Sequence, residues 1–138
     1  MADTILKKRD TCFSCAVRCK RVVEAEYEGT HIDPYYGGPE YETLGTFGSM
    51  CGIQSLEMVS LANQICNAYG VDSIACGATI AFAMECFEKG VITTQDTGGI
   101  ELTFGNEAAV LQILDQIVNV STPFGKILAE GSARAAEI

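Results

Sequence analysis

The sequence predicts a mainly α, multihelical domain with one short β-hairpin near its N-terminus. Two observations carry this prediction. From Ser55 onward, apolar residues recur with helical spacing, and residues that cap or stop helices bound each such segment. Before that point, residues 22–30 combine β-branched and aromatic residues and lead into a turn-rich segment.

Size and composition suit one globular domain spanning residues 1–138. The chain has 48% hydrophobic and 20% charged residues, which is ordinary for a protein with a hydrophobic core. Its net charge of −9 argues against general nucleic-acid binding. No apolar run is long enough to cross a bilayer, so we expect no membrane segment. Seven cysteines without an apolar leader indicate a reducing compartment, and we expect a cytoplasmic protein.

The first forty residues contain the predicted hairpin and two loops. Residues 1–22 hold closely spaced cysteines, and we expect them to form a cysteine-rich cluster loop. Residues 22–30 include Val22 and Val23, which favour β-strands. Residues 31–39 are dense in turn formers and predict a further loop.

Two helices are predicted in the middle of the chain. Apolar residues fall on one face of residues 55–69, and Gly70 is a typical helix stop. Asp72 follows as the N-cap of a second helix, which closes at Gly90. Small residues within 75–81 would let another segment approach this second helix closely. Packing of the two helices would then position the turn between them.

Two more helices are predicted toward the C-terminus. One begins at Asn106, a capping residue, and the other near Pro123, which is favoured in the first turn of a helix. Residues 128–138 have helical propensity and no stop signal. We therefore expect the chain to be a piece of a longer protein.

Cys12, Cys15 and Cys19 have C-x2-C-x3-C spacing. On a tight loop this spacing directs three sulfurs toward one centre, and such soft ligands select zinc or iron–sulfur. Either centre needs a fourth ligand. Three unrelated cysteines, or a disulfide and a spare thiol, are the alternative on spacing alone. The other cysteines lie in apolar contexts and are expected to be small buried hydrophobic residues: Cys51, Cys66, Cys76 and Cys86.

Charge is distributed unevenly along the chain. Residues 1–22 carry a local charge of +4, whereas residues 23–138 carry −13. Arg18, Lys20 and Arg21 surround the last cysteine of the cluster. Nearby cations stabilise an anionic four-thiolate iron–sulfur cluster, although the same residues also fit a solvated basic face.

Four segments together resemble the aldehyde:ferredoxin oxidoreductase family. They occur in the family's order between residues 11 and 137: TCFSCAVRCKRV, GGPEYETLGTFGSMCGI, ANQICNAYGVDSIACGATIAFAMECFEKGVIT and LAEGSARAAE. The resemblance implies the first of two helical domains in a large cytosolic enzyme. It implies a parent that oxidises aldehydes to carboxylic acids at tungsten, or molybdenum, held by two pterins. A 4Fe–4S cluster beside the pterin would pass the electrons to ferredoxin.

The resemblance also implies roles for individual residues. Cys12, Cys15 and Cys19 match the first three cluster ligands, and the fourth would come from a segment far downstream. Glu42 matches a glutamate near the metal, which could accept a proton as water adds to the aldehyde. Its neighbour Glu40 is the second choice for this role. A surface acid beside a turn is the alternative for Glu42.

Residues 67–72 match a D-x-x-G-L-D motif whose polar side chains bind a pterin. The matching residues are Asn67, Gly70, Val71 and Asp72, with Asn in place of the first acid and Val in place of Leu. An amide can still hydrogen-bond a pterin. Asn67 and Gly70 could also end one helix while Asp72 caps the next, and the two roles can coexist.

A separate iron between subunits is not expected. Some family members bind this iron with E-x-x-H on the helix before the motif, where this chain has Leu61-Ala-Asn-Gln64. His31, the single histidine, lies in a turn-rich segment and is not expected to be a ligand.

The sequence leaves two other functions open. The chain could be a stand-alone zinc or iron–sulfur module that recruits Cys51 or water as fourth ligand, or it could be a helical interaction domain. In the preferred interpretation the chain supplies part of the pterin wall of an enzyme whose partners are ferredoxin and an aldehyde. By itself it would be inactive and hold no cofactor. It would also self-associate through apolar surface that other domains normally cover.

Overall fold

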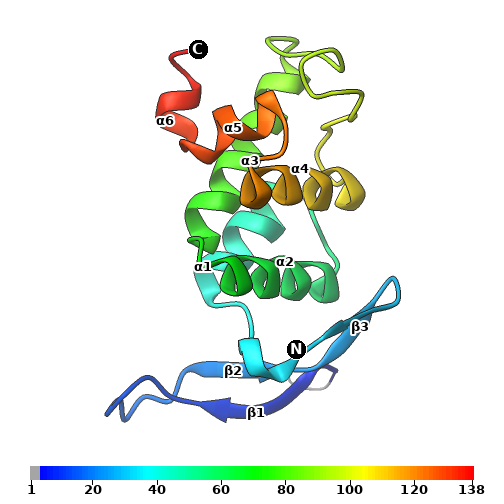
Figure 1. The fold of residues 1–138 in the computed structure, drawn as a ribbon. Coiled ribbons are helices and arrows are strands. Elements are labelled where there is room, and N and C mark those ends of the chain that lie inside the picture. The colour runs from blue at the N-terminus through cyan, green and yellow to red at the C-terminus, as the bar shows by residue number, and fades with distance from the viewer. Residues whose placement is uncertain (1–3) are drawn as a thin grey trace.

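The N-terminal end of the molecule is built from two β-hairpins. The computed structural model describes residues 4–138. Both hairpins are antiparallel, with β1 paired to β2 and β3 paired to β4. Figure 1 shows the first hairpin at one end of the molecule and the second leading toward the helices. The strands are β1 Leu6–Asp10, β2 Lys20–Val23, β3 Ala25–Tyr27 and β4 Thr30–Ile32.

The first hairpin corrects the expectation of a loop over residues 1–22. Residues 6–10 pair with residues 20–23, and the segment between these two strands is the loop that carries the cysteines. Lys7, Lys8 and Arg9 of β1 are all exposed. No apolar alternation therefore marks β1 as a strand, and its pairing with β2 is what holds it extended.

The second hairpin confirms the short hairpin expected near residues 20–30 and extends it. Its strand β4 includes Ile32, which is buried and lies in the segment predicted to be a loop. The turn formers that follow make a short 3-10 turn, η1, Pro34–Tyr36. Asp33 begins this turn, because its carboxylate accepts a hydrogen bond of 2.8 Å from the backbone N–H of Tyr35.

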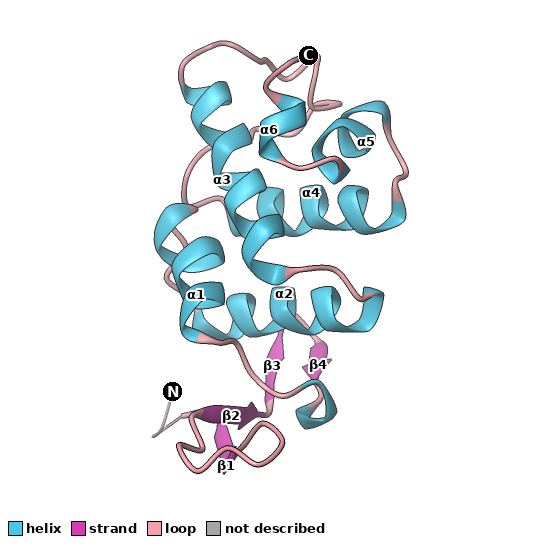
Figure 2. Cartoon of the chain, turned by 90° about the vertical axis from the view of Figure 1, so that its left-hand side faces the viewer, coloured by secondary structure: helices cyan, strands magenta, loops and turns pink. Residues whose placement is uncertain are grey.

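Helices and the loops between them form the rest of the described chain, and the longest of these loops connects residues 88 and 107. The helices are α1 Tyr41–Thr43, the π-helical η2 Leu44–Met50, α2 Leu56–Tyr69, α3 Ser73–Glu88, α4 Glu107–Asn119, α5 Pro123–Ala129 and α6 Ser132–Ala135. The predicted caps are confirmed, since Asp72 and Asn106 each accept a hydrogen bond from the first turn of α3 and α4. The sequence pattern predicts neither α1 nor η2. Figure 2 shows the helices stacked above the hairpins.

The hydrophobic core lies where α2, α3 and α4 pack around η2. Its largest fully buried side chains include Phe47, Met58, Ile80, Met84, Ile113 and Leu114. Helix α3 approaches η2 most closely at Gly77, where an added Cβ would lie 2.6 Å from Oγ1 of Thr46. This contact confirms the close approach expected for the small residues of 75–81.

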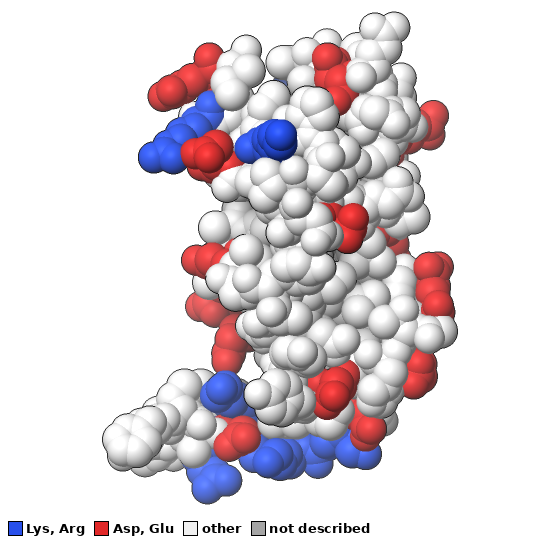
Figure 3. All heavy atoms as spheres, viewed as in Figure 1, with Lys and Arg blue, Asp and Glu red and all other residues white. Residues whose placement is uncertain are grey.

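The hairpin end and the helical part of the fold differ in charge. Figure 3 shows most Lys and Arg side chains along the hairpin end and a smaller group at the opposite end, whereas Asp and Glu are scattered over the surface. The basic residues of this end lie on β1, β2 and the loop between them: Lys7, Lys8, Arg9, Arg18, Lys20 and Arg21. Within residues 4–138, no helix combines the length and the apolar character needed to cross a bilayer.

Candidate functional site

A cavity of about 450 Å³ lies between the first hairpin and the helices. Residues from β1, β2, η1, α2 and α3 line it, so segments far apart in the sequence meet there. Much of the wall is polar or charged, which suits a polar ligand. The polar wall includes Lys8, Asp10, Lys20, Glu40, Asn63 and Asn67.

The position of η1 against the hairpin depends on a close backbone approach at Gly38. An added Cβ there would lie 2.9 Å from Cγ1 of Val23 and 3.1 Å from the carbonyl oxygen of Arg21. The backbone N–H of Val23 also donates a hydrogen bond of 3.3 Å to the carbonyl of Gly37. A larger residue at Gly38 would push the hairpin away and open this side of the cavity.

The turn between α2 and α3 forms another side of the site. Asn67 lines the cavity, and its Nδ2 donates a hydrogen bond of 2.9 Å to the carbonyl of Tyr36. Gly70 ends α2 in the left-handed conformation, with φ of 71°. The N–H of Val71 then donates to the carbonyl of Cys66 at 2.9 Å. Of the residues matched to the pterin motif, Asn67 alone is part of the cavity wall.

Asp72 has a structural role that is visible directly. Its Oδ1 accepts hydrogen bonds from the backbone N–H groups of Ile74, at 2.8 Å, and Ala75, at 3.1 Å. These bonds cap α3 and fix where its first turn begins. The next residue, Ser73, lines the cavity, and its Oγ lies 2.8 Å from Oγ1 of the buried Thr43. The cap therefore places a hydroxyl pair at the cavity wall.

Asn63 is a wall residue that the sequence analysis did not single out. It lies on α2, one turn before Asn67, and is only 5% exposed. Within residues 4–138 its side-chain amide makes no hydrogen bond. Its polar atoms keep some accessible surface, because no side-chain nitrogen or oxygen of the described chain is both fully enclosed and unpartnered. The available signal was a polar residue inside the apolar face of a predicted helix.

The two candidate glutamates differ in their relation to the cavity. Both Glu40 and Glu42 are exposed at the start of α1. Glu40, the second choice from the sequence, lines the cavity, whereas Glu42 is not part of its wall. Glu40 precedes the first turn of α1 in extended conformation, whereas Glu42 lies within that turn.

Charged groups of the hairpin form the opposite wall. Asp10 lies 3.7 Å from Nζ of Lys8, and both residues line the cavity with Lys20. The backbone N–H of Thr11 donates to Asp10 and, together with the charges of Lys8 and Lys20, lowers the pKa of this carboxyl. Asp10 is therefore ionised at neutral pH. The two lysines leave this wall with a net positive charge.

The cysteine cluster lies at the tip of the first hairpin, in the loop of residues 11–19. Cys12 and Cys19 are exposed and Cys15 is half-buried. The N–H of Cys15 donates to the carbonyl of Cys12 at 3.1 Å, and the hydroxyl of Thr11 donates to the carbonyls of Cys12 and Cys15. The Arg21 guanidinium donates to the carbonyl of Cys19. Hydrogen bonds thus shape the loop, and two of its three cysteines, Cys12 and Cys19, are exposed.

The thiols of this loop are soft donors, the ligand type that iron–sulfur clusters and zinc take. Within the described residues, no three His, Cys, Asp or Glu side chains are placed so that they could hold one metal ion. A 4Fe–4S cluster binds each thiolate at a different iron, so its ligands spread more widely than those of tetrahedral zinc. Cys12, Cys15 and Cys19 supply three thiols on one basic loop, which is the donor type such a cluster takes.

The remaining cysteines confirm the expected hydrophobic role. Cys51, Cys66 and Cys76 are buried and Cys86 is half-buried. The Cys51 thiol donates to the carbonyls of Thr46, at 3.3 Å, and Gly77, at 3.7 Å. Burial raises the pKa of Cys51 to about 12. Cys51 is therefore held in the core and does not support the alternative of a recruited fourth metal ligand.

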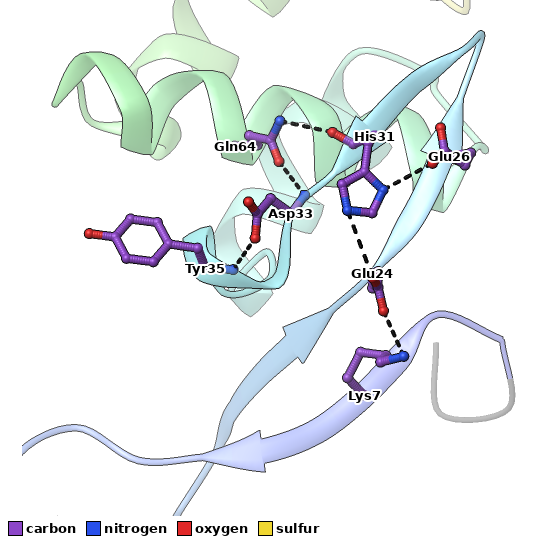
Figure 4. Close-up of polar contacts among 7 residues, drawn as sticks. All are labelled: Lys7, Glu24, Glu26, His31, Asp33, Tyr35 and Gln64. Atoms are coloured by element: carbon purple, nitrogen blue, oxygen red, sulfur yellow. Dashed lines mark hydrogen bonds and ion pairs between the residues drawn. The ribbon is translucent and has the colours of Figure 1, made fainter.

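His31 belongs to a polar network that joins both hairpins to α2 (Figure 4). Its Nδ1 lies 2.9 Å from Oε1 of Glu26, and its Nε2 lies 3.7 Å from Oε1 of Glu24. Lys7 reaches Glu24 from β1 at 2.6 Å. Gln64 of α2 accepts from the N–H of Asp33 at 2.7 Å and donates to the carbonyl of His31 at 3.2 Å.

The two positions that the sequence analysis matched to the E-x-x-H motif have other contacts in this structure. Gln64, at the position matched to the histidine of that site, binds the backbone of the second hairpin. Leu61, at the position matched to the glutamate, is buried. Both side chains therefore have packing or hydrogen-bonding roles within this chain.

Comparison with known protein families shows which family this chain belongs to. The family described as "Aldehyde ferredoxin oxidoreductase, domains 2 & 3" matches residues 1–138. The chain belongs to the aldehyde ferredoxin oxidoreductase family. Membership makes it part of an oxidoreductase lineage and confirms the resemblance carried by the sequence motifs.

Individual members of the family show the same relationship. The chain is 36% identical to a tungsten-containing aldehyde ferredoxin oxidoreductase of Pyrococcus horikoshii, over 99% of this chain and 22% of the relative. It is 34% identical to a subunit of Pyrococcus furiosus named "Aliphatic sulfonate oxidoreductase, WOR-like subunit", over 96% of this chain and 21% of that one. The chain thus spans about a fifth of the length of these relatives.

A solved structure shares the fold. The active-site complex BamBC of benzoyl coenzyme A reductase, in complex with 1,5-dienoyl-CoA, superposes with a TM-score of 0.74 and 27% sequence identity. The match covers 98% of this chain and 19% of that one. The arrangement of hairpins and helices in this chain therefore also occurs in a solved structure that is named for a different activity.

Proposed function

We propose that this chain forms one wall of the cofactor site in an enzyme that oxidises aldehydes to carboxylic acids. The cofactor would be tungsten, or molybdenum, held by two pterins, with electrons leaving through a 4Fe–4S cluster to ferredoxin. Support comes from family membership and from tungsten-containing relatives that match along the whole chain. When bound, the metal–pterin centre supplies the two-electron oxidation of the substrate carbon.

The observation that carries the proposal is the cavity itself. It joins the α2–α3 turn, which holds the motif matched to pterin binding, with the hairpin whose tip holds the cysteines. An amide from Asn67, a hydroxyl from Ser73 and cations from Lys8 and Lys20 surround one space. A heterocycle with polar edges and an anionic tail fits such a wall. Asp72 and Gly70 would act mainly by holding the turn in place.

A carboxylate at the start of α1 would accept the proton released when water adds to the aldehyde. Oxidation of an aldehyde consumes one water and releases two protons and two electrons. Glu40 or Glu42 could accept a proton from that water as it adds to the carbonyl. Glu42 remains the residue assigned by motif position, and Glu40 is favoured by its place in the cavity wall. Glu40→Gln and Glu42→Gln, made separately, would distinguish the two residues. Only the variant that lacks the proton-accepting carboxylate should lose turnover.

The hairpin tip would hold three of the four cluster ligands. Cys12, Cys15 and Cys19 lie on one loop whose flanks carry Arg18 and Lys20. These cations would stabilise the negative charge of a four-thiolate cluster. The fourth ligand would come from another segment of the protein. We accordingly propose that the 138 residues alone are inactive and hold no complete cluster.

The apolar surface of the isolated chain would favour self-association. A second cavity, of about 620 Å³, lies among α3, α5 and the C-terminal residues and is lined largely by apolar side chains such as Phe82, Phe124 and Ile127. Exposed apolar surface of this kind promotes contacts between copies. Sedimentation of the 138-residue chain at increasing concentration would reveal such oligomers, whereas a concentration-independent monomer would contradict this part of the proposal.

The test uses the complete gene product that contains this chain. It would be produced without oxygen and with tungstate, and analysed for iron, sulfide, tungsten and pterin, and for aldehyde oxidation coupled to ferredoxin. Cys15→Ser should remove most of the iron and the electron transfer. Cys86→Ser, which changes a half-buried helix residue outside the loop, should leave both unchanged.

Two outcomes would contradict the proposed function. Stoichiometric zinc with no iron or pterin would support a single-metal module. Wild-type protein with neither pterin nor tungsten would remove the basis for a redox site and leave a helical interaction domain as the better function.

A further inference from the structure

The cavity wall contains a buried amide that the fold itself does not use. Asn63 is 5% exposed and makes no hydrogen bond within residues 4–138. The other buried polar residue of the same helix behaves differently, because Ser60 donates its hydroxyl to the carbonyl of Leu56 at 2.8 Å. Buried polar groups in proteins are normally paired, so an unpaired one needs an external explanation.

The exposed part of Asn63 must include its amide. No side-chain nitrogen or oxygen in the described chain is both fully enclosed and unpartnered. Since the Asn63 amide has no partner, its polar atoms must retain a little accessible surface. Asn63 also lines the cavity. The amide is therefore directed at the cavity, where a ligand can reach it.

Asn63 and Asn67 form a pair on one face of α2. Residues four apart on a helix are neighbours, so both amides face the same space. Asn67 donates its Nδ2 group to the carbonyl of Tyr36 at 2.9 Å, which leaves its Oδ1 as an acceptor for a ligand. Asn63 offers both its donors and its acceptor. Together they match a planar heterocycle whose edge alternates donors and acceptors.

The rest of the helix does not require an asparagine at this position. Asparagine is a weaker helix former than leucine, and Asn63 lies among buried apolar neighbours of α2 such as Leu61 and Ala62. A leucine there would fill similar volume and remove the unmet polar group.

We propose that Asn63 hydrogen-bonds the heterocyclic edge of the pterin, next to Asn67. This inference rests on the proposed function of the cavity as the pterin site. The pyrimidine portion of a pterin carries an amino group, a ring N–H and a carbonyl along one edge, which complements a carboxamide. Asn63 thus acts as a binding residue and satisfies its buried amide only in the loaded protein.

The test compares two variants with a matched control in the complete gene product. Asn63→Leu removes the amide at similar volume, and Asn63→Ala removes it without any possible clash. Asn119→Leu makes the same chemical change at an exposed amide of α4, which bonds only to Asp115 and does not line the cavity. Pterin and tungsten per polypeptide are measured for each protein. The thermal midpoint is measured for protein made in a host that cannot make the pterin.

Both Asn63 variants should hold pterin roughly tenfold more weakly than the wild type, as expected for the loss of one or two hydrogen bonds. The cofactor-free Asn63→Leu protein should melt at the wild-type temperature or above, because an unmet buried polar group has been removed. Asn119→Leu should match the wild type in both measurements.

Other results would overturn the inference. If Asn63→Leu and Asn63→Ala keep wild-type pterin content, Asn63 is no binding residue. If Asn63→Leu lowers the melting temperature of the cofactor-free protein, the amide has a structural role instead. If the wild type itself holds no pterin, the proposed function fails, which is a result distinct from retention by the variants.

Discussion

At the scale of single residues, burial divides the cysteines into two chemical groups. The Cys12 and Cys19 thiols are exposed on the hairpin tip, whereas Cys51 lies in the core and donates to two backbone carbonyls. Thiol reactivity follows the thiolate fraction and access to solvent. The same residue type therefore serves as a potential ligand in one place and as a small apolar side chain in another.

Alkylation should separate these two groups. At a pH of about 8, iodoacetamide should modify Cys12 and Cys19 in the native, metal-free protein and leave Cys51 unmodified, because burial raises the pKa of Cys51 to about 12. Peptide mass spectrometry measures the modification of each cysteine. In denaturant, all three should react. Native labelling of Cys51 as fast as that of Cys12 would contradict the packing described for η2 and α3.

At the scale of secondary-structure elements, the junction of α2 and α3 matters most for the site. Gly70 ends α2 and Asp72 caps α3, so two residues fix the angle at which the helices separate. Asn67 and Ser73 then lie on either side of the junction at the cavity wall. The two helix caps therefore determine where these potential ligand-binding side chains lie.

Removal of the Asp72 cap should destabilise the fold. Asp72→Ala deprives the N–H groups of Ile74 and Ala75 of their acceptor and should lower the free energy of unfolding by about 1 kcal/mol. Asp72→Asn should retain most of the stability, because asparagine caps helices about equally well. Urea unfolding measures both changes. An unaltered unfolding free energy in Asp72→Ala would show that the cap is not made in solution.

The contact between α3 and η2 should tolerate no added side chain. Gly77→Ala places a Cβ 2.6 Å from Oγ1 and 2.8 Å from Cβ of Thr46, and should lower the free energy of unfolding by about 1–3 kcal/mol. Gly45→Ala is the control, because a Cβ there meets nothing within 4 Å and alanine favours helix. The melting temperatures of the two variants, measured by thermal unfolding, compare the two sites. Equal melting temperatures would argue against the close approach.

At the scale of the whole molecule, the second hairpin is tied to the helical part by a side-chain bond across 80 residues. The hydroxyl of Tyr27 on β3 donates to Oε2 of Glu107, in the first turn of α4, at 2.6 Å. Burial, together with this bond to a carboxylate, raises the pKa of Tyr27 above its ordinary value of 10.0. The contact therefore depends on a protonated tyrosine.

The raised pKa of Tyr27 gives a definite pH dependence. The folded protein holds the Tyr27 proton more tightly than the unfolded chain, so this contribution to stability is complete below pH 10.0 and is lost as the pH rises above it. Tyr27→Phe should lower the unfolding free energy by about 1 kcal/mol at neutral pH and reduce the decline above pH 10.0. Urea unfolding across this pH range measures both effects. Tyr35→Phe, at an exposed side chain, should change neither.

The pattern of residues along the sequence was sufficient to predict the three main helices. Apolar spacing with a cap at each start predicts α2, α3 and α4 because these helices bury one continuous face, and short-range chemistry marks their ends. The same reasoning misses β1, α1 and η2. The charged side chains of β1 carry no apolar alternation, and the short α1 and η2 are held by their contacts with α3.

Some features of the candidate site could also be predicted from the sequence, whereas others required the tertiary structure. The sequence by itself determined the cysteine loop, the helix caps and the family motif at residues 67–72, because each depends on a few residues close together in the chain. Only the tertiary structure decided that Glu40 and Asn63 line the cavity and that Lys8 and Lys20 line the same cavity as Asn67. The physical reason is that a cavity wall is made by packing segments distant in sequence, and the exposure of a side chain depends on what covers it.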